Sequence, residues 1–135
     1  MADAIHHLVP ASELKAGCSE RAYSPARLPE DGFVHCSSGR ATTLAVANDY
    51  FAGLDEPLLV LAIDVERLDV EVRFEAPAPI AGGGDAHLAE ATTFPHVYGP
   101  IDRAAVTQVG TLVREGGRYG WPRSWHPLDE VLASL

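Results

Sequence analysis

The feature of this chain that most constrains its fold is a nearly continuous apolar run, PLLVLAIDV, which extends from Pro57 to Val65. Its first charged side chain is Asp64, and it contains several of the branched aliphatic residues that favour strands. A strand with one exposed face alternates apolar and polar residues, whereas this run does not alternate. We therefore predict a central β-strand that is buried on both of its faces.

Other segments on either side of this run predict further strands. Val70, Val72 and Phe74 alternate with charged residues, which is the pattern of a half-buried strand whose apolar side chains face the core. The remaining segments are short and are bounded by residues that favour turns. The predicted strands cover Ala4–Val9, Phe33–Cys36, Val70–Glu75, His96–Tyr98 and Ala104–Val113.

Short helices are predicted mainly in the first half of the chain. Pro10 opens the first helix and Gly17 ends it. A second helix runs from about Arg40 to Ala52, and the Ser–Ser–Gly sequence before it supplies cap residues. A loop is predicted over Cys18–Asp31, and a longer, glycine-containing loop over Ala76–Phe94. Because helices come early and strands late, the predicted class is α+β rather than a regular βαβ series.

The length and composition of the chain indicate one globular domain. With 135 residues, of which 47% are hydrophobic, residues 1–135 are expected to share a single core. The longest apolar run is too short to cross a bilayer, and the N-terminal sequence lacks the features of a secretory signal. Two cysteines, Cys18 and Cys36, do not make a disulfide framework. We expect a cytoplasmic protein without a membrane partner.

The net charge restricts the partners of the chain. The formal charge at pH 7 is −9, so long nucleic acids should be repelled. A small phosphorylated ligand is compatible with this charge, because one arginine and a helix N-terminus can hold a phosphate locally. The oligomeric state does not follow from the sequence.

The first candidate site is the segment GFVHCSS, in which polar residues follow a predicted strand. His35 lies at the end of this strand, and Ser37 and Ser38 precede a helix that begins at about Arg40. The serine hydroxyls, the helix N–H groups and Arg40 could together receive an anionic group. In the alternative interpretation, the serines are only caps and His35 is a strand residue with its hydrogen bonds satisfied.

The second candidate site is the segment FPHVYGP. Its prolines and glycine predict rigid turns on both sides of His96 and Tyr98, which suits side chains that must be held still. The alternative is a loop-to-strand junction with Tyr98 packed on the core.

Further histidines and one carboxylate add to these candidates. His6 and His7 are neighbours in a predicted strand and therefore point to opposite faces. Glu75 ends the alternating strand and, beside a histidine in a cleft, could take part in acid–base chemistry; an exposed surface position is the alternative. The histidines and Cys36 also suggest a metal, although no H-x-x-x-H or C-x-x-C spacing supports one. We therefore assign no metal ligands.

In these segments the chain resembles the bacterial family known as domain of unknown function 952. The resemblance is carried, in order, by IHHL, GFVHCSS, ANDYF, LLVLAIDVERL, VRFE and FPHVYGPI. It covers residues 4–113, and residues 114–135 form a C-terminal extension outside it. That family is similar in fold to ADP-ribosyltransferases and RNA 2′-phosphotransferases, which bind NAD in a cleft of a split β-sheet. The resemblance thus implies a split mixed or antiparallel β-sheet with short helices and NAD as the cofactor.

The resemblance also implies roles for individual residues. His7 is expected to contact the ribose on the adenosine side, and His35 to lie beside the nicotinamide. His96 is expected where many of these transferases have the glutamate that orients the nicotinamide ribose. Histidine has no carboxylate, so ordinary mono-ADP-ribosylation is not expected, and Glu75 is the candidate to substitute in part.

Three functions are compatible with the sequence. The first is a transferase or NAD-cleaving enzyme that binds NAD or an ADP-ribose-type nucleotide. The second is a non-catalytic nucleotide-binding or interaction module, and the third is a histidine-based, metal-dependent hydrolase. For the first, we expect catalytic roles for His35, His96 and Glu75, and cofactor binding by His7, Ser37, Ser38, Arg40 and Tyr98.

Overall fold

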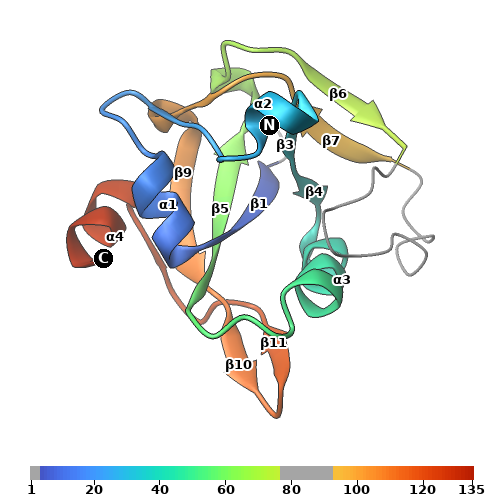
Figure 1. Ribbon diagram of the computed structural model, residues 1–135, viewed down its shortest axis with the longest axis vertical. Coiled ribbons are helices and arrows are strands. Elements are labelled where there is room, and N and C mark those ends of the chain that lie inside the picture. The colour runs from blue at the N-terminus through green and yellow to red at the C-terminus, as the bar shows by residue number, and fades with distance from the viewer. Residues whose placement is uncertain (1–3, 77–92) are drawn as a thin grey trace.

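A computed structural model describes residues 4–76 and 93–135 of the chain. Its largest sheet has five strands in the order β12–β9–β5–β1–β4 (Figure 1). Every pairing between the described strands is antiparallel. The bounds of these five strands are β1 Ala4–Pro10, β4 Ser37–Ser38, β5 Leu58–Asp64, β9 Val106–Thr111 and β12 Trp125–His126.

The predicted central strand is confirmed in β5, which pairs with β1 on one side and with β9 on the other. Alternate residues of β5 enter two separate cores. Leu59, Leu61 and Ile63 belong to a larger core, which α1, α4 and the second sheet cover. Leu58 and Val60 belong to a smaller core on the opposite face. The absence of alternation in the apolar run therefore reflects burial on both faces of the sheet.

A second sheet has the order β3–β7–β6 and covers part of the larger core. Its strands are β3 Val34–His35, β7 Phe94–Val97 and β6 Val72–Glu75. Of the strand predicted over Phe33–Cys36, Val34–His35 forms β3 in this sheet; the chain then leaves the sheet and enters the five-stranded sheet at Ser37 (Figure 1). Buried Cys36 lies at the crossing point.

Four α-helices and several smaller elements complete the described fold (Figure 1). The predicted α+β class is confirmed, as are the two early helices. The segment predicted as a loop over Cys18–Asp31 contains one short strand and one short helix. Most of the loop predicted over Ala76–Phe94 lies outside the described residues. The helices are α1 Ala11–Gly17, α2 Leu28–Asp31, α3 Arg40–Tyr50 and α4 Leu128–Ser134, and the remaining elements are strands β2 Ala22–Tyr23, β8 Ile101–Asp102, β10 Val113–Glu115 and β11 Arg118–Gly120 and 3-10 turns Val65–Arg67 and Arg103–Ala105.

None of the described helices has the length and apolar character that crossing a membrane would need.

Two local predictions were wrong. Ser37 and Ser38 do not cap α3, because both pair with β1; Gly39 is the N-cap residue, with a φ of 84° that favours glycine. Phe74 does not face the core but is 57% exposed. It lies on β6, an edge strand of the three-stranded sheet, and in this strand Val72 packs against the core instead.

The C-terminal residues pack against the rest of the domain. Strand β12 pairs with β9, with Trp125 opposite Gly110. Trp121 and Trp125 are half-buried against the smaller core, and their rings contact each other. A Cβ added at Gly110 would lie 2.6 Å from Cγ of Pro122 and 3.1 Å from Cε3 of Trp125. The close approach of the C-terminal segment to β9 therefore requires glycine at this position.

We predict that Gly110→Ala lowers the free energy of unfolding by roughly 1–3 kcal/mol, because the added methyl group overpacks this contact. Gly53→Ala is the matched control, since a Cβ there meets nothing within 4 Å, and it should change stability by less than about 0.5 kcal/mol. Urea denaturation followed by tryptophan fluorescence measures both. Equal stability of the two variants would contradict the packing of the C-terminal segment on β9.

Candidate functional site

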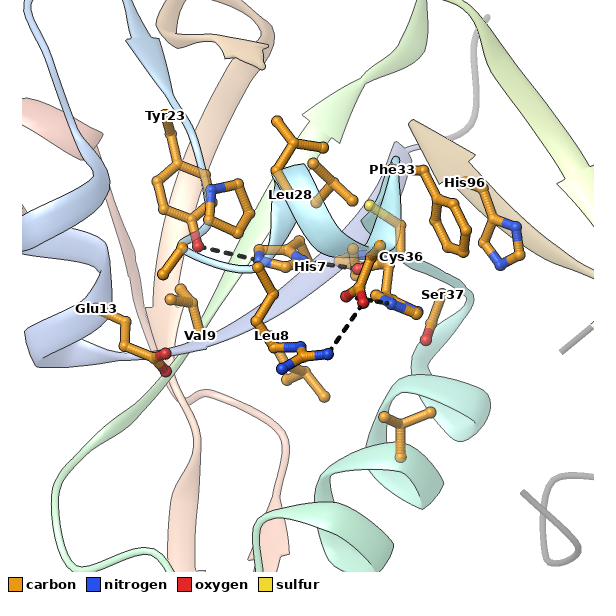
Figure 2. A pocket seen from close by; sticks show the side chains of 18 of the residues that line it. His7, Leu8, Val9, Glu13, Tyr23, Leu28, Phe33, Cys36, Ser37 and His96 are labelled. Atoms are coloured by element: carbon orange, nitrogen blue, oxygen red, sulfur yellow. Dashed lines mark hydrogen bonds and ion pairs between the residues drawn. The ribbon is translucent and has the colours of Figure 1, made fainter. Parts of the chain in front are cut away.

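The candidate site is a pocket of about 300 Å³ beside strand β1 (Figure 2). Strand β1 pairs with β5 along its whole length, but with β4 only at Ile5 and His6. From His7 onward its second edge is therefore not paired with β4, and this part of β1 lines the pocket together with residues of α2, β3 and α3. Four of the lining residues are histidines: His6, His7, His35 and His96.

His7 is buried and is held by two hydrogen bonds. Its Nδ1 lies 2.6 Å from the carbonyl oxygen of His35, so Nδ1 carries the hydrogen and donates it. Its Nε2 then accepts a hydrogen bond from the hydroxyl of Tyr23 at 3.2 Å (Figure 2). Burial lowers the pKa of His7 to about 4, which the hydrogen bond to His35 only partly offsets. His7 is therefore neutral at neutral pH, and both of its nitrogens have protein partners.

His35 is oriented by a carboxylate. Its Nε2 lies 3.1 Å from Oδ2 of Asp31, and the other carboxylate oxygen of Asp31 accepts a hydrogen bond from Arg27 at 3.3 Å. Burial lowers the pKa of His35, and the hydrogen bond to Asp31 opposes this effect. Asp31 ends α2 four residues before His35, so the short helix and the turn after it bring the carboxylate back to the ring.

His96 is also oriented by a carboxylate. Its Nδ1 lies 3.0 Å from Oε1 of Glu75, and the hydroxyl of Tyr98 donates a second hydrogen bond to the same oxygen. The hydrogen bond from Tyr98 is the main cause that lowers the pKa of Glu75, and the hydrogen bond from His96 adds to it. The Glu75 side chain therefore remains a carboxylate at neutral pH. The side chain of His96 is only 4% exposed. Glu75 therefore contacts a histidine of the pocket, while its own side chain is 37% exposed and lies outside the pocket lining. Its role in acid–base chemistry stays a prediction.

The pairing of β3 with β7 brings the two histidines together. His35 is directly opposite His96 in this antiparallel register, so both side chains project from the same face of the sheet. Their ring centroids are 6.0 Å apart. Phe33 stacks on His96 at 4.0 Å and contacts His35 at 4.7 Å, which gives the pair an aromatic wall (Figure 2).

Each histidine of this pair keeps one ring nitrogen free. Among the described residues, no hydrogen bond reaches Nδ1 of His35 or Nε2 of His96, and neither atom is a fully buried one without a partner. A neutral imidazole whose one nitrogen is bonded to a carboxylate can accept a proton at its second nitrogen. The protonated ring can then donate this proton to a reacting group. The arrangement is thus chemically suited to paired proton transfer.

The other predicted ligand-binding residues are divided between pocket and surface. Buried Ser37 lines the pocket, whereas Ser38 is exposed and lies outside the pocket lining. Tyr98 reaches the site through Glu75. Arg40 is exposed on α3, with its guanidinium carbon 5.9 Å from the centroid of the Trp121 ring. Arg40 is therefore not among the pocket residues.

Sequence reasoning missed the residues that support the histidines. From the sequence, Asp31 is only the last residue of a predicted loop, and Arg27 and Phe33 have no assigned role. Tyr23 lay in a predicted loop, yet its side chain is fully buried beside His7. The available signal was the four-residue spacing of Asp31 and His35, which is a weak signal without knowledge of the helix between them.

Two observations bear on nucleophile and metal chemistry. Cys36 is buried, and burial raises the pKa of its thiol far above the usual range, so it is not a thiolate nucleophile. Across residues 4–76 and 93–135, no group of three or more histidine, cysteine, aspartate or glutamate side chains is arranged to hold a metal ion.

Comparison with known proteins gives the family. The model of the family described as Protein of unknown function (DUF952) matches residues 8–109, which include both histidine motifs. The chain belongs to this family. The comparison with curated proteins found no match. The family predicted from the motifs is thus confirmed, while the similarity to ADP-ribosyltransferases stays a prediction.

Solved structures of one protein share the fold of this family member. The crystal structure of CC0527 from Caulobacter crescentus is 26% identical, with a TM-score of 0.67, and the match covers 96% of this chain and 98% of that chain. A double mutant of CC0527 has the same TM-score and coverage at 25% identity. The solution NMR structure has a TM-score of 0.62 at 26% identity and covers 89% and 91% of the two chains.

The burial of His7 predicts a specific pH dependence of stability. Its pKa is 6.5 when unperturbed and about 4 in the folded protein, so the unfolded state binds more protons between these values. The contribution of neutral His7 to stability is complete above about pH 6.5 and is lost as the pH falls toward 4. We expect the free energy of unfolding to fall by about 2 kcal/mol from this residue between pH 7 and pH 5.

Urea denaturation of wild type and His7→Gln at both pH values measures this contribution. Between pH 7 and pH 5 the free energy of unfolding of the variant should fall by about 2 kcal/mol less than that of wild type. The fall that remains in the variant comes from groups such as His6 and His35, whose pKa values burial also lowers. Exposed His126→Ala is the matched control and should keep the wild-type dependence. An unchanged dependence in His7→Gln would show that His7 is not held neutral by burial.

Proposed function

We propose that this protein is an enzyme that binds an NAD- or ADP-ribose-type nucleotide in the pocket beside β1 and uses His35 and His96 for proton transfer. The observation that carries the proposal is the facing pair of histidines, each held by a carboxylate through one nitrogen and free at the other. Ion pairs that serve only the fold usually lie on the surface, whereas His35 and His96 both line a pocket.

The size and lining of the pocket support a ligand of nucleoside size. A volume of about 300 Å³ is at the lower end of the range for small-molecule sites, so it suits one ring and its ribose rather than a whole dinucleotide. Phe33 offers an aromatic face to such a ring. Buried Ser37 adds a hydroxyl at the same wall.

Arg27 is best placed to bind a phosphate of the ligand. Among the described pocket residues it is the one arginine or lysine, and its side chain is 58% exposed, so it can turn toward a ligand at the mouth. This role replaces the one predicted for Arg40, which lies outside the pocket lining. His7 then acts as a positioning residue, because its hydrogen bond holds the backbone of His35.

The similarity to ADP-ribosyltransferases forms part of this proposal. It is supported by the position of the pocket, between the unpaired edge of β1 and the strands that carry the two histidines. The carboxylate of Glu75 contacts His96 from outside the pocket lining and is the group proposed to orient a ribose hydroxyl. A non-catalytic nucleotide-binding module would use the same pocket without turnover.

Calorimetric titration of NAD and of ADP-ribose in chelator-treated buffer tests the proposal. Wild type should bind at least one of them saturably, His35→Ala should bind it at least tenfold more weakly, and exposed His126→Ala should bind like wild type. Chromatography of the same samples reports nicotinamide release. Binding without any product would favour the module, and the absence of heat from both ligands at millimolar concentration would refute the proposal.

A further inference from the structure

The paired histidines narrow the class of reaction. We infer that the pocket cleaves a phosphodiester next to a ribose 2′-hydroxyl, with His35 as the general base and His96 as the general acid, and that the product is a 2′,3′-cyclic phosphate. This inference rests on the proposed nucleotide site and specifies which bond breaks there. It follows from the geometry of two independent carboxylate–histidine pairs on one face of one sheet.

The reaction needs two proton transfers on opposite sides of one phosphorus atom. A base removes the proton from the attacking hydroxyl, and an acid protonates the leaving oxygen. Single-histidine sites use one ring for both steps in turn, whereas two rings with centroids 6.0 Å apart can serve both steps at once. In the inferred reaction the phosphate lies between the two rings, with its attacking and leaving oxygens in line.

His35 is suited to the role of base. The hydrogen on its Nε2 is donated to Asp31, so the lone pair of the neutral ring is on Nδ1. Burial lowers its pKa, which keeps the ring neutral at neutral pH. Asp31 also stabilises the imidazolium that forms when Nδ1 takes the proton.

His96 is suited to the role of acid. Glu75 is an ionised carboxylate 3.0 Å from Nδ1, so a proton on Nε2 gives an ion pair rather than an isolated buried charge. Tyr98 holds the carboxylate through a hydrogen bond to the same oxygen, and Phe33 stacks on the His96 ring and fixes its plane. Nε2 is the free atom from which the leaving oxygen receives its proton.

The atoms and charges of the step balance without another reactant. The 2′-oxygen forms a bond to phosphorus and gives its proton to Nδ1 of His35, while the bond from phosphorus to the 5′-oxygen breaks and this oxygen takes the proton of Nε2 of His96. No electrons are exchanged with any oxidant or reductant. Water later returns both rings to their starting protonation states. Arg27 at the pocket wall can offset the negative charge that develops on the phosphoryl oxygens.

The charge of the chain limits the substrate to small ribonucleotides. A formal charge of −9 repels long RNA, whose binders usually carry a positively charged face. The pocket accommodates one nucleoside, so the second half of a dinucleotide would extend toward the solvent. The inferred substrate class is therefore a dinucleotide or a similar ribose phosphodiester.

The test uses adenylyl-(3′,5′)-adenosine, incubated with the full chain in chelator-treated buffer and analysed by chromatography and ³¹P NMR. Wild type should release adenosine and adenosine 2′,3′-cyclic phosphate. His35→Ala and His96→Ala should each lower the rate by at least about a hundred-fold, because each removes one proton transfer. His126→Ala, at an exposed histidine outside the pocket lining, should keep the wild-type rate. The analogue that lacks the attacking 2′-hydroxyl should not be cleaved.

The outcomes separate this inference from the proposed function. Absence of cyclic phosphate from wild type, with NAD or ADP-ribose still bound, would overturn the inference alone. Absence of both binding and cleavage would overturn both. Cleavage that persists in either histidine variant, or that acts equally on the 2′-deoxy analogue, would also contradict the inference. Circular dichroism of each variant checks the fold, and His35→Gln or His96→Gln replaces any alanine variant that does not fold, with the same loss expected.

Discussion

Burial of β5 on both faces is the constraint on which the other parts of the domain depend. A strand without a polar face must have strands on both edges and a core on each side, and β1, β9 and the two cores meet this requirement. Strand β1 is consequently fixed along one edge by β5, while only Ile5 and His6 of its other edge pair with β4. The unpaired remainder of that edge becomes a wall of the pocket.

The site combines polar side chains with a largely apolar environment, and hydrogen bonds make this combination stable. An unpaired histidine in such a place would lose the hydration of its ring nitrogens, which costs free energy. His7 avoids this cost with two protein partners, and His35 and His96 each have one carboxylate partner. Buried Nδ1 of His6 is the exception among the described residues, and it has no hydrogen-bond partner. The nitrogens of His35 and His96 that remain free are therefore the ones available to a ligand.

Much of the fold could be predicted from the sequence, because β5 and the early helices carry local patterns that fit one structure only. The site could be predicted only in part. His35 and His96 were identified from polar residues at strand ends, but their pairing depends on the register of β3 against β7, which are far apart in the chain. The Ser–Ser pair fits a cap and a short strand equally well, and pairing with β1 decides between them. Asp31 fits a turn equally well, and its contact with His35 follows from the geometry of α2.

The most direct test of the paired-histidine account is the tautomer of each ring, measured by long-range ¹H–¹⁵N NMR near pH 7 and assigned with single histidine variants. Because Glu75 can only accept, Nδ1 of His96 must carry a hydrogen whether or not Nε2 is also protonated; because Asp31 can only accept, the hydrogen of neutral His35 must be on Nε2. The account predicts a hydrogen fixed on Nδ1 of His96 and the single Nε2–H tautomer for His35. Signals of both rings that match the tautomer mixture of an unrestrained histidine would contradict it.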